Sequence, residues 1–337
     1  MTGRAVIRTR IRRLRGWGGV ASMAGAVALT ATLLPLAAAD AARGGPYGVG
    51  QEAPARGGQT LRQQDAGECA GERPPGRPQA SWRPSGADGP AVSRIKGKGK
   101  LVVGVDQNSY QWGYRDPATG ELRGFDIDLA RAIAAELGIG GDDIIYRAIP
   151  TSQRVPALQG RKVDMVVRTM TINCDRLKDV EFSTAYFEAG QQVLAPKNSK
   201  ITGFDTSLDG KRVCAAQGST AEEFITKELK NAEVVPVPNQ LDCLVRVQLG
   251  LADAVITDNA LAAGQAAQDP SMELKGRPLT REYYGVAMNK EDRDLVARVN
   301  KVLEDYRASG EWRKAYELWL SKVMPGVKAA PVPEYLD

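Results

Sequence analysis

From residue 101 onward, short apolar segments that resemble buried strands alternate with amphipathic helical segments. The predicted strands occupy 101–105, 144–149, 163–168, 212–216, 233–237 and 253–257. After Asp126, the apolar residues Leu129, Ile133 and Leu137 recur every four positions, which predicts a helix capped by Asp126 and ended by Gly138. Two further amphipathic helices are predicted at 290–308 and 311–323. This alternation is typical of α/β architecture.

A basic and then apolar N-terminus predicts export. Six arginines and no acidic residue lie in the first 15 positions, and 17–39 is an uncharged stretch that ends in alanines. These features form a secretory signal, and the length also permits a retained membrane anchor. We therefore expect 1–41 to be a signal peptide or an anchor. The chain would then act at the extracellular face of the cytoplasmic membrane.

The net charge of +5 does not indicate a nucleic-acid-binding surface. Without the six N-terminal arginines, 39 basic residues face 40 acidic ones. The basic balance is therefore a targeting feature, and we expect no nucleic-acid partner.

The segment after the apolar stretch has the composition of a linker. Residues 42–92 are crowded with Gly, Pro, Gln and Arg and show no periodicity, which predicts a disordered tether. The last residues, 324–337, read as a Pro-rich C-terminal tail.

Cysteine and histidine content limit the chemistry. The chain has four cysteines, no CxxC spacing and no histidine. An even number of cysteines in an exported chain favours disulfides over metal sites, so we expect no metal and no cofactor. The absence of histidine excludes every mechanism that depends on an imidazole acid or base.

Hydroxyl groups and an arginine follow the predicted strand at 163–167. Thr169, Thr171 and Arg176 lie where open α/β sheets bind ligands, beyond the carboxyl end of a strand. Arg176 can hold a carboxylate through two parallel N–H bonds, which lysine cannot do. The alternative is a surface arginine paired with Asp175 or Asp179.

Two helix starts add further candidates for anion binding. Arg154 lies in a predicted first helical turn, and its alternative is a solvated arginine. Ser219 and Glu222 match a capping box, and Ser219 with Thr220 would present free N–H groups to an anion. The ordinary alternative is capping without any ligand.

Acidic residues offer one candidate for an ammonium group. Asp258 ends the strand at 253–257 and could hold an ammonium, or it could simply cap the next helix. Asp126 and Asp128 resemble metal ligands at first sight, but helix capping explains them better.

Taken together, the motifs between 101 and 323 resemble the bacterial extracellular solute-binding proteins of family 3, which bind polar amino acids. The matching segments, with the positions they occupy, are LVVGVD at 101–106, GFDIDLA at 124–130, TMTINCDR at 169–176, VEFSTAY at 180–186, GKRVC at 210–214 and ADAVITD at 252–258. The resemblance is strongest to an actinobacterial glutamate/aspartate-binding branch, which shares the ending VPEYLD.

The resemblance implies a two-lobe fold of the periplasmic-binding-protein type II, with two crossing hinge strands. Lobe 1 would comprise 93–186 and 285–323, and lobe 2 would comprise 187–284. Arg176, Thr171 and the backbone of Ser219 and Thr220 would bind the α-carboxylate of an amino acid. Asp258 and Thr169 would bind its ammonium group, and Arg154 would bind an acidic side chain. This site is similar to those of glutamate and aspartate binders.

The resemblance also suggests a disulfide pairing. Cys174 replaces the acidic or proline residue usual in the family motif, and a related branch pairs such a cysteine with one before the domain. We therefore expect disulfides Cys69–Cys174 and Cys214–Cys243. On a chain-entropy estimate each contributes roughly 3 to 5 kcal/mol to stability.

The implied function is binding of glutamate or aspartate by hinge closure and delivery to an ABC permease. We expect a monomer that is not an enzyme. One alternative is sensing, in which the closed form signals to a membrane receptor or kinase. Another is a dehydratase of cyclic amino-acid precursors, for which Glu181 or Glu188 would have to supply the acid or base.

Overall fold

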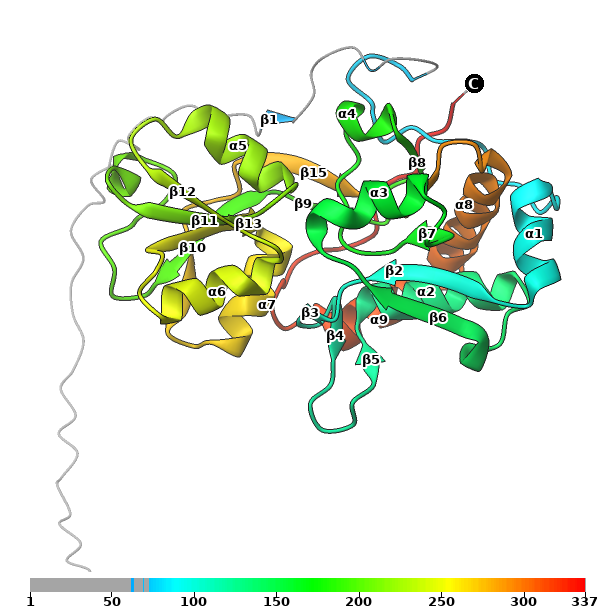
Figure 1. The fold of residues 1–337 in the computed structure, drawn as a ribbon, viewed down its shortest axis with the longest axis horizontal. Helices are drawn as coiled ribbons and strands as arrows, with labels where there is room; N and C mark the ends of the chain where they lie inside the picture. Colours follow the sequence, from blue (N-terminus) through cyan, green and yellow to red (C-terminus); the bar gives the residue numbers. More distant parts are fainter. Residues whose placement is uncertain (1–61, 64–68, 70–72, 337) are drawn as a thin grey trace, which may run out of the picture. The chain divides into compact units, whose positions relative to one another are not determined.

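The computed structural model describes residues 62–63, 69 and 73–336. Two five-stranded mixed sheets form its centre (Figure 1). In spatial order, the first sheet contains β6 (Ile144–Ala148), β2 (Leu101–Val105), β7 (Met165–Val166), β16 (Ala287–Asn289) and β8 (Val180–Phe182). The second contains β12 (Glu233–Val237), β11 (Arg212–Ala216), β13 (Ala254–Asp258), β10 (Gln191–Pro196) and β14 (Met272–Lys275). We call the parts built on these sheets lobe 1 and lobe 2.

Helices cover both faces of the first sheet. Alternate residues of β2 point to opposite faces, and Leu101, Val103 and Val105 pack against helices on one of them. Those helices are α1 (Pro90–Lys98), α2 (Phe125–Glu136), α8 (Arg293–Ala308) and α9 (Glu311–Trp319). Val102 and Val166 pack on the other face with α3 (Arg154–Gln159) and α4 (Cys174–Leu177). A small hairpin sheet of β3 (Asn108–Ser109), β4 (Gly113–Arg115) and β5 (Leu122–Arg123) extends lobe 1.

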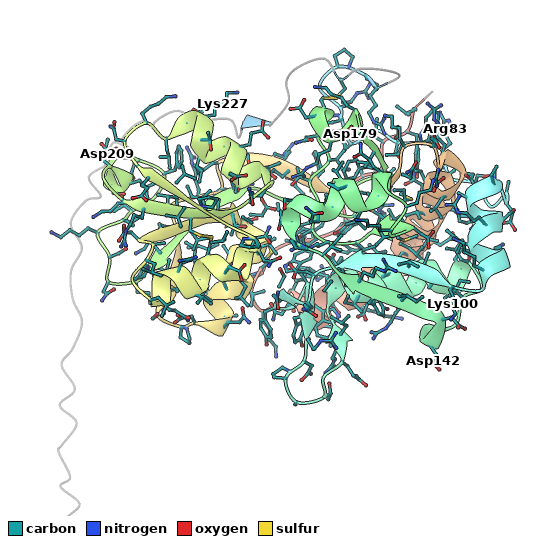
Figure 2. The ribbon with its side chains drawn as sticks, viewed as in Figure 1. Arg83, Lys100, Asp142, Asp179, Asp209 and Lys227 are labelled. Atoms are coloured by element: carbon teal, nitrogen blue, oxygen red, sulfur yellow. A yellow bond between two sulfur atoms is a disulfide. The ribbon has the colours of Figure 1, made fainter. Side chains whose placement is uncertain are left out.

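The second sheet is also covered on both faces. Val193, Val213 and Ile256 face α5 (Thr220–Glu228) on one side. Leu194 and Val255 face α6 (Gln240–Gln248) and α7 (Asn259–Gln268) on the other. Figure 1 shows α5 on one side of this sheet and α6 and α7 on the other. Charged side chains lie at the outside, including Lys100, Asp142, Asp209 and Lys227 in Figure 2.

Two antiparallel strands carry the chain between the lobes. β9 (Phe187–Ala189) leads from β8 to β10, and β15 (Thr280–Tyr284) leads from β14 back to β16. The short strand β1 (Arg62–Gln63) pairs with β15 in parallel, so a segment far earlier in the chain borders this connection. The boundaries of the lobes in the sequence analysis, at 187 and 285, stay a prediction.

The segment before lobe 1 is more ordered than a tether. The sequence analysis expected disorder through 92, but 73–92 packs on lobe 1 and contains the start of α1. The buried Arg73 pairs with Glu181 at 2.6 Å, and the hydroxyl of Ser81 donates to the carbonyl of Phe182. The sequence analysis predicted disorder because the segment has few aliphatic residues. These polar contacts, rather than aliphatic packing, attach the segment to lobe 1. At the far end of the chain, Tyr335 forms a parallel β-bridge with Ser81.

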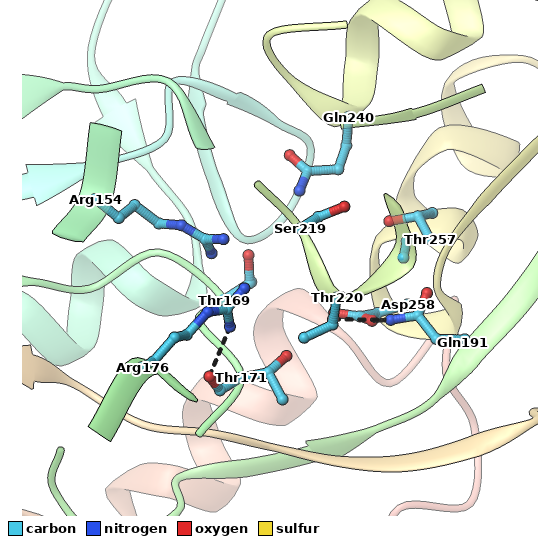
Figure 3. Close-up of a pocket in the computed structure, with 11 residues that line it drawn as sticks. Arg154, Thr169, Thr171, Arg176, Gln191, Ser219, Thr220, Gln240, Thr257 and Asp258 are labelled. Atoms are coloured by element: carbon cyan, nitrogen blue, oxygen red, sulfur yellow. Dashed lines mark hydrogen bonds between the residues drawn. The ribbon is translucent and has the colours of Figure 1, made fainter. Parts of the chain in front are cut away.

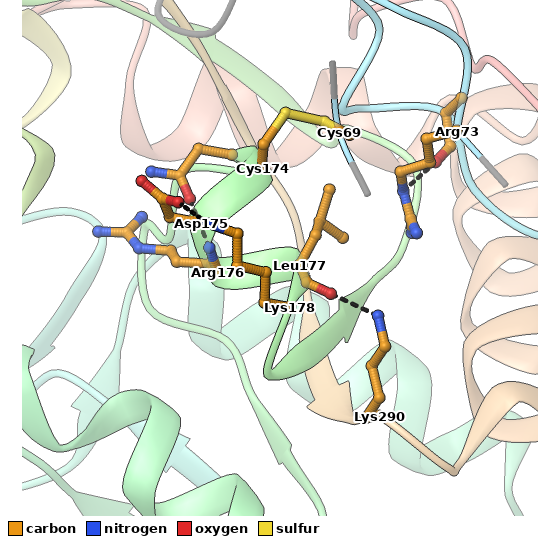
Figure 4. Close-up of a disulfide and its surroundings, with 10 residues drawn as sticks. Cys69, Arg73, Cys174, Asp175, Arg176, Leu177, Lys178 and Lys290 are labelled. Atoms are coloured by element: carbon orange, nitrogen blue, oxygen red, sulfur yellow. Dashed lines mark hydrogen bonds and ion pairs between the residues drawn. A yellow bond between two sulfur atoms is a disulfide. The ribbon is translucent and has the colours of Figure 1, made fainter. Parts of the chain in front are cut away.

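Both expected cysteine pairs are disulfides in the structure. Cys69–Cys174 joins the early segment to α4 across 105 positions, with a Cα–Cα distance of 4.9 Å (Figure 4). Cys214–Cys243 joins β11 to α6, with a Cα–Cα distance of 5.5 Å. The first disulfide therefore connects the segment before lobe 1 to the neighbourhood of Arg176.

Asp126 does not cap α2, contrary to the sequence analysis. The N-cap is Gly124, with a φ of 126°, and a side chain there would collide with the carbonyl oxygen of Trp112. Asp126 instead lies buried inside the first turn. It accepts the N–H of Thr169 at 3.0 Å and the hydroxyl of Tyr186 at 2.9 Å. Its role is to hold the Thr169 loop.

Some predicted elements are shorter than expected. The strand predicted at 163–168 is only Met165–Val166, because Thr169 adopts a left-handed conformation with a φ of 40° and turns the chain. The helix predicted at 311–323 ends at Trp319. The apolar stretch at 17–39 lies outside the described residues, and among those described no helix is long and apolar enough to cross a membrane.

Substitution of Gly190 tests the connection between the lobes. A Cβ atom at Gly190 would lie 2.0 Å from the carbonyl oxygen of Thr280, at the start of β15. We expect Gly190→Ala to lower the free energy of unfolding by about 1 to 3 kcal/mol, measured by urea denaturation. The control Gly97→Ala lies in α1 with open space around it, and it should raise stability by up to about 1 kcal/mol. Equal stability of the two variants would contradict this packing.

Asp126 predicts a pH dependence of stability. Burial raises the pKa of Asp126 to about 7, although hydrogen bonds from Tyr186 and Thr169 act in the opposite direction. Because the folded pKa exceeds the unfolded value, the stabilising contribution is complete below about pH 4 and is lost as the pH rises to about 7. In isolation this amounts to roughly 4 kcal/mol. Asp126→Asn should remove this pH dependence of the free energy of unfolding, measured by urea denaturation between pH 4 and 8. The same pH dependence in the variant and the wild-type protein would refute this role of Asp126.

Candidate functional site

A small pocket lies between the two lobes. All seven ligand-binding candidates from the sequence line it, and Figure 3 shows them converging. The empty space is about 220 Å³, which includes solvent at the mouth. The candidates are Arg154, Thr169, Thr171, Arg176, Ser219, Thr220 and Asp258.

The elements bring these residues together at the carboxyl ends of strands. Thr169 and Thr171 follow β7, and Arg176 lies on α4 directly after them. Arg154 begins α3, Thr220 begins α5 after β11, and Asp258 ends β13. Such a position is where ligands bind in open α/β sheets.

Arg154 is a buried cation. Its side chain donates to three backbone carbonyls, those of Thr151 at 2.9 Å, Gly218 at 3.4 Å and Arg168 at 3.5 Å. The residue is only 3% exposed, and no described carboxylate forms an ion pair with it. Burial and the nearby guanidinium of Arg176 lower the pKa of Arg154 well below its usual value. A charge held in this way favours an anionic ligand.

Arg176 reaches the same region from α4. It donates to the carbonyl of Thr171 at 2.6 Å and to the carbonyl of Gly218, across the pocket, at 3.3 Å. Its backbone N–H donates to the side chain of Asn173, which caps α4. The alternative from the sequence was a surface arginine paired with Asp175 or Asp179, whereas these two carbonyl contacts bring the guanidinium to the pocket.

Asp258 faces the arginines from lobe 2. Its carboxylate accepts from Gln191 Nε2 at 2.6 Å and from the hydroxyl of Tyr284. Burial and the nearby charge of Glu282 raise the pKa of Asp258 well above its usual value. Although Asp258 occupies the N-cap position of α7, its side chain makes no capping bond there.

Ser219 combines capping with a pocket position. Its hydroxyl accepts the N–H of Glu222, as the capping box predicted. The carboxylate of Glu222 accepts the N–H of Gly218 rather than that of Ser219. The N–H of Ser219 donates to the carbonyl of Ala216 at 3.1 Å, so Ser219 does not offer the free N–H group that the sequence analysis expected of it.

Sequence reasoning missed four lining residues, namely Gln191, Ala221, Gln240 and Thr257. Gln191 is fully buried, and its Nε2 donates to Asp258 at 2.6 Å and lies 3.1 Å from the hydroxyl oxygen of Thr220. The signal in the sequence is a pair of glutamines at the start of an apolar strand, which predicts a buried polar role but no ligand. Gln240 accepts from the hydroxyl of Thr151 in lobe 1.

Further bonds join the lobes beside the pocket. Trp112 Nε1 donates to the carbonyl of Ala260 at 3.1 Å, and Arg168 donates to the Asn239 side chain at 3.1 Å. The arginine bonds to Gly218 add to these contacts. The structure thus holds the lobes in a closed arrangement.

The acids considered for catalysis are elsewhere. Glu181 forms ion pairs with Arg73 and Lys290, and Glu188 pairs with Arg281. Neither lines the pocket. Within the part of the chain that the structure describes, no group of three potential ligands could hold a metal ion.

Comparisons with known proteins place the chain in a family. The sequence model of bacterial extracellular solute-binding proteins, family 3, matches residues 101–322. The ABC transporter glutamine-binding protein GlnH of Bacillus subtilis (strain 168) is 34% identical over 231 residues, which is 68% of this chain and 85% of that protein. The L-glutamate/L-aspartate-binding protein of Pseudomonas aeruginosa is 28% identical, covering 69% of this chain and 81% of that protein.

A solved structure agrees with this assignment. A mutant of ArgBP, an arginine-binding protein from T. maritima, has a TM-score of 0.65 and 33% identity. The match covers 69% of this chain and 100% of that one. The actinobacterial branch stays a prediction, because the glutamine-binding relative is more similar than the glutamate/aspartate-binding one. The chain belongs to the bacterial extracellular solute-binding proteins of family 3 and has the two-lobed type II fold of periplasmic binding proteins.

Proposed function

We propose that the chain binds glutamate between its lobes outside the cytoplasm and delivers it to an ABC permease. The observation that carries this proposal is Arg154, a buried guanidinium with only carbonyl partners, next to a second arginine and opposite a buried acid. A dicarboxylic amino acid has two carboxylates to pair with the two arginines and one ammonium group to pair with the acid.

The α-carboxylate is assigned to Arg176. A guanidinium at the mouth of a closing pocket can hold a carboxylate with two parallel bonds. The α-ammonium group is assigned to Asp258, with Thr169 beside it. A ligand held from both lobes would stabilise the closed arrangement. Hinge closure around a ligand is a common motion of periplasmic binding proteins.

The side chain of the ligand is assigned to Arg154. An uncompensated buried charge is costly, and a second carboxylate would neutralise the guanidinium. Aspartate offers the same groups on a shorter chain. The small cavity favours a single amino acid over a peptide.

Glutamine is the second candidate. The glutamine-binding protein of Bacillus subtilis is the more similar of the two relatives compared above. An amide oxygen can accept from Arg154 but leaves its charge unbalanced. The charge of Arg154 therefore supports glutamate over glutamine.

We further propose a monomer that is exported to the extracellular face of the cytoplasmic membrane through a cleaved signal or a retained N-terminal anchor. In the sensing alternative, the closed form signals to a membrane receptor or kinase. Neighbouring genes separate the two functions, because transport requires a permease and an ATPase.

Arg176→Ala tests the proposed function directly. Calorimetry with glutamate, aspartate and glutamine should show binding to the wild-type protein and loss of affinity in the variant. Removing one member of a buried charge pair costs roughly 2 to 5 kcal/mol, or about 30-fold to several thousand-fold in affinity. Normal affinity of the variant would refute the role of Arg176, and a wild-type protein that binds no amino acid would refute the function.

Arg154→Gln tests whether Arg154 recognises a carboxylate on the side chain of the ligand. We expect glutamate affinity to fall by about 30-fold or more, whereas glutamine affinity should change much less because no charge pair is lost. The matched control is Arg147→Gln, an exposed arginine on β6 away from the pocket. Equal losses for the two ligands would show that Arg154 does not recognise the carboxylate of the side chain.

A further inference from the structure

Glu282 lies beneath the pocket without lining it. It belongs to β15, the strand that returns from lobe 2 to lobe 1, and it is 1% exposed. Nothing in the sequence analysis singled it out. Its two carboxylate oxygens nevertheless accept four side-chain hydrogen bonds.

The bonds to Glu282 come from both lobes. Oε2 accepts the hydroxyl of Thr171 from lobe 1 and the hydroxyl of Thr220 from lobe 2, each at 2.7 Å. Oε1 accepts from Gln191 at 2.6 Å and from Thr280 at 3.1 Å. One carboxylate oxygen of Glu282 therefore connects two pocket-lining residues that belong to different lobes.

These bonds determine what the threonines can offer a ligand. A hydroxyl has one proton, and Thr171 and Thr220 both direct theirs to Glu282. Their oxygens can then only accept, that of Thr220 with Gln191 Nε2 already 3.1 Å away, and both residues line the pocket. Acceptors suit an ammonium group rather than a carboxylate, so the hydroxyl of Thr171 fits the ligand's cation and not the carboxylate that the sequence analysis assigned to it.

The charge of Glu282 also reaches the pocket. Its described hydrogen-bond donors are all neutral, and no ion pair with a described cation balances it. Gln191 connects it to Asp258, since the same Nε2 donates to both carboxylates at 2.6 Å. A buried negative charge beside the ligand disfavours additional negative charge on that ligand.

We infer that Glu282 is a positioning residue that turns Thr171 and Thr220 into acceptors for the ligand's ammonium group and sets the preference for ligand charge. This inference rests on the proposed amino-acid-binding function. Glu282 thereby couples the hinge strand to ligand recognition.

Two substitutions separate the effect of the negative charge of Glu282 from the effect of its side-chain length. Glu282→Gln keeps the shape but removes the charge and one acceptor. We expect the Kd values for glutamate and glutamine to rise about tenfold or more. The preference for glutamate over glutamine should increase at least roughly threefold, because negative charge is lost near the ligand. Glu282→Asp keeps the charge but is too short to reach both threonines, so both Kd values should rise by similar factors.

Glu188→Gln is the matched control. Glu188 lies on the paired strand β9 and forms an exposed ion pair with Arg281, so both Kd values should stay unchanged. A purely structural role of Glu282 predicts equal losses for the two ligands in Glu282→Gln, and that result would overturn the inference. Wild-type protein that binds neither amino acid would overturn the proposed function and this inference together.

A double-mutant cycle keeps the inference testable if Glu282→Gln does not fold. Glu282→Asp and Thr220→Val remove the same contact, so their effects on the glutamate Kd should be strongly non-additive. Additive effects would show that Glu282 does not act through Thr220.

Discussion

The meeting of two guanidinium groups at one pocket, the buried Arg154 and the half-buried Arg176, is the constraint on which the rest of the site depends. Arg154 and Arg176 repel each other, and the first is removed from water. Both arginines donate to the carbonyl of Gly218, which they reach across the pocket. Closure of the lobes and neutralisation of the arginines are therefore linked. An anionic ligand would favour both, because ion pairs with the arginines would replace weak carbonyl contacts.

The fold was largely predictable from the sequence because burial follows the period of each element. The strands at 212–216 and 233–237 match β11 and β12 in full, since each is a short, mainly apolar run that follows one charged residue. The strand at 163–168 was overestimated because the left-handed conformation of Thr169 is set by a tertiary bond to Asp126. The order of 73–92 was missed for the same kind of reason. Arg73 and Ser81 are anchored by distant partners that local composition does not reveal.

The site divides in the same way. The candidate arginines, hydroxyls and Asp258 follow strands, so their position in the sequence was enough to bring them to one edge. Gln191 and Glu282 lie within strands, where alternation predicts only whether a side chain is buried. Their importance arises because Gln191 begins β10 directly after the connecting strand β9, and Glu282 lies on the other connecting strand, β15. A single sequence contains no signal for which strands cross.

The early segment shows how distant parts of the chain bear on one pocket. Cys174 begins α4 and is bonded to Cys69, and Arg176 lies two residues further along the same short helix. A few residues before Cys69, β1 pairs with β15, the strand that carries Glu282. Arg176, which we propose contacts the ligand from lobe 1, and Glu282 are thus both attached to a segment that precedes the sheets. A helix of one turn such as α4 has little stability of its own. The position of Arg176 therefore depends on the Asn173 cap and on this covalent attachment more than on the helix itself.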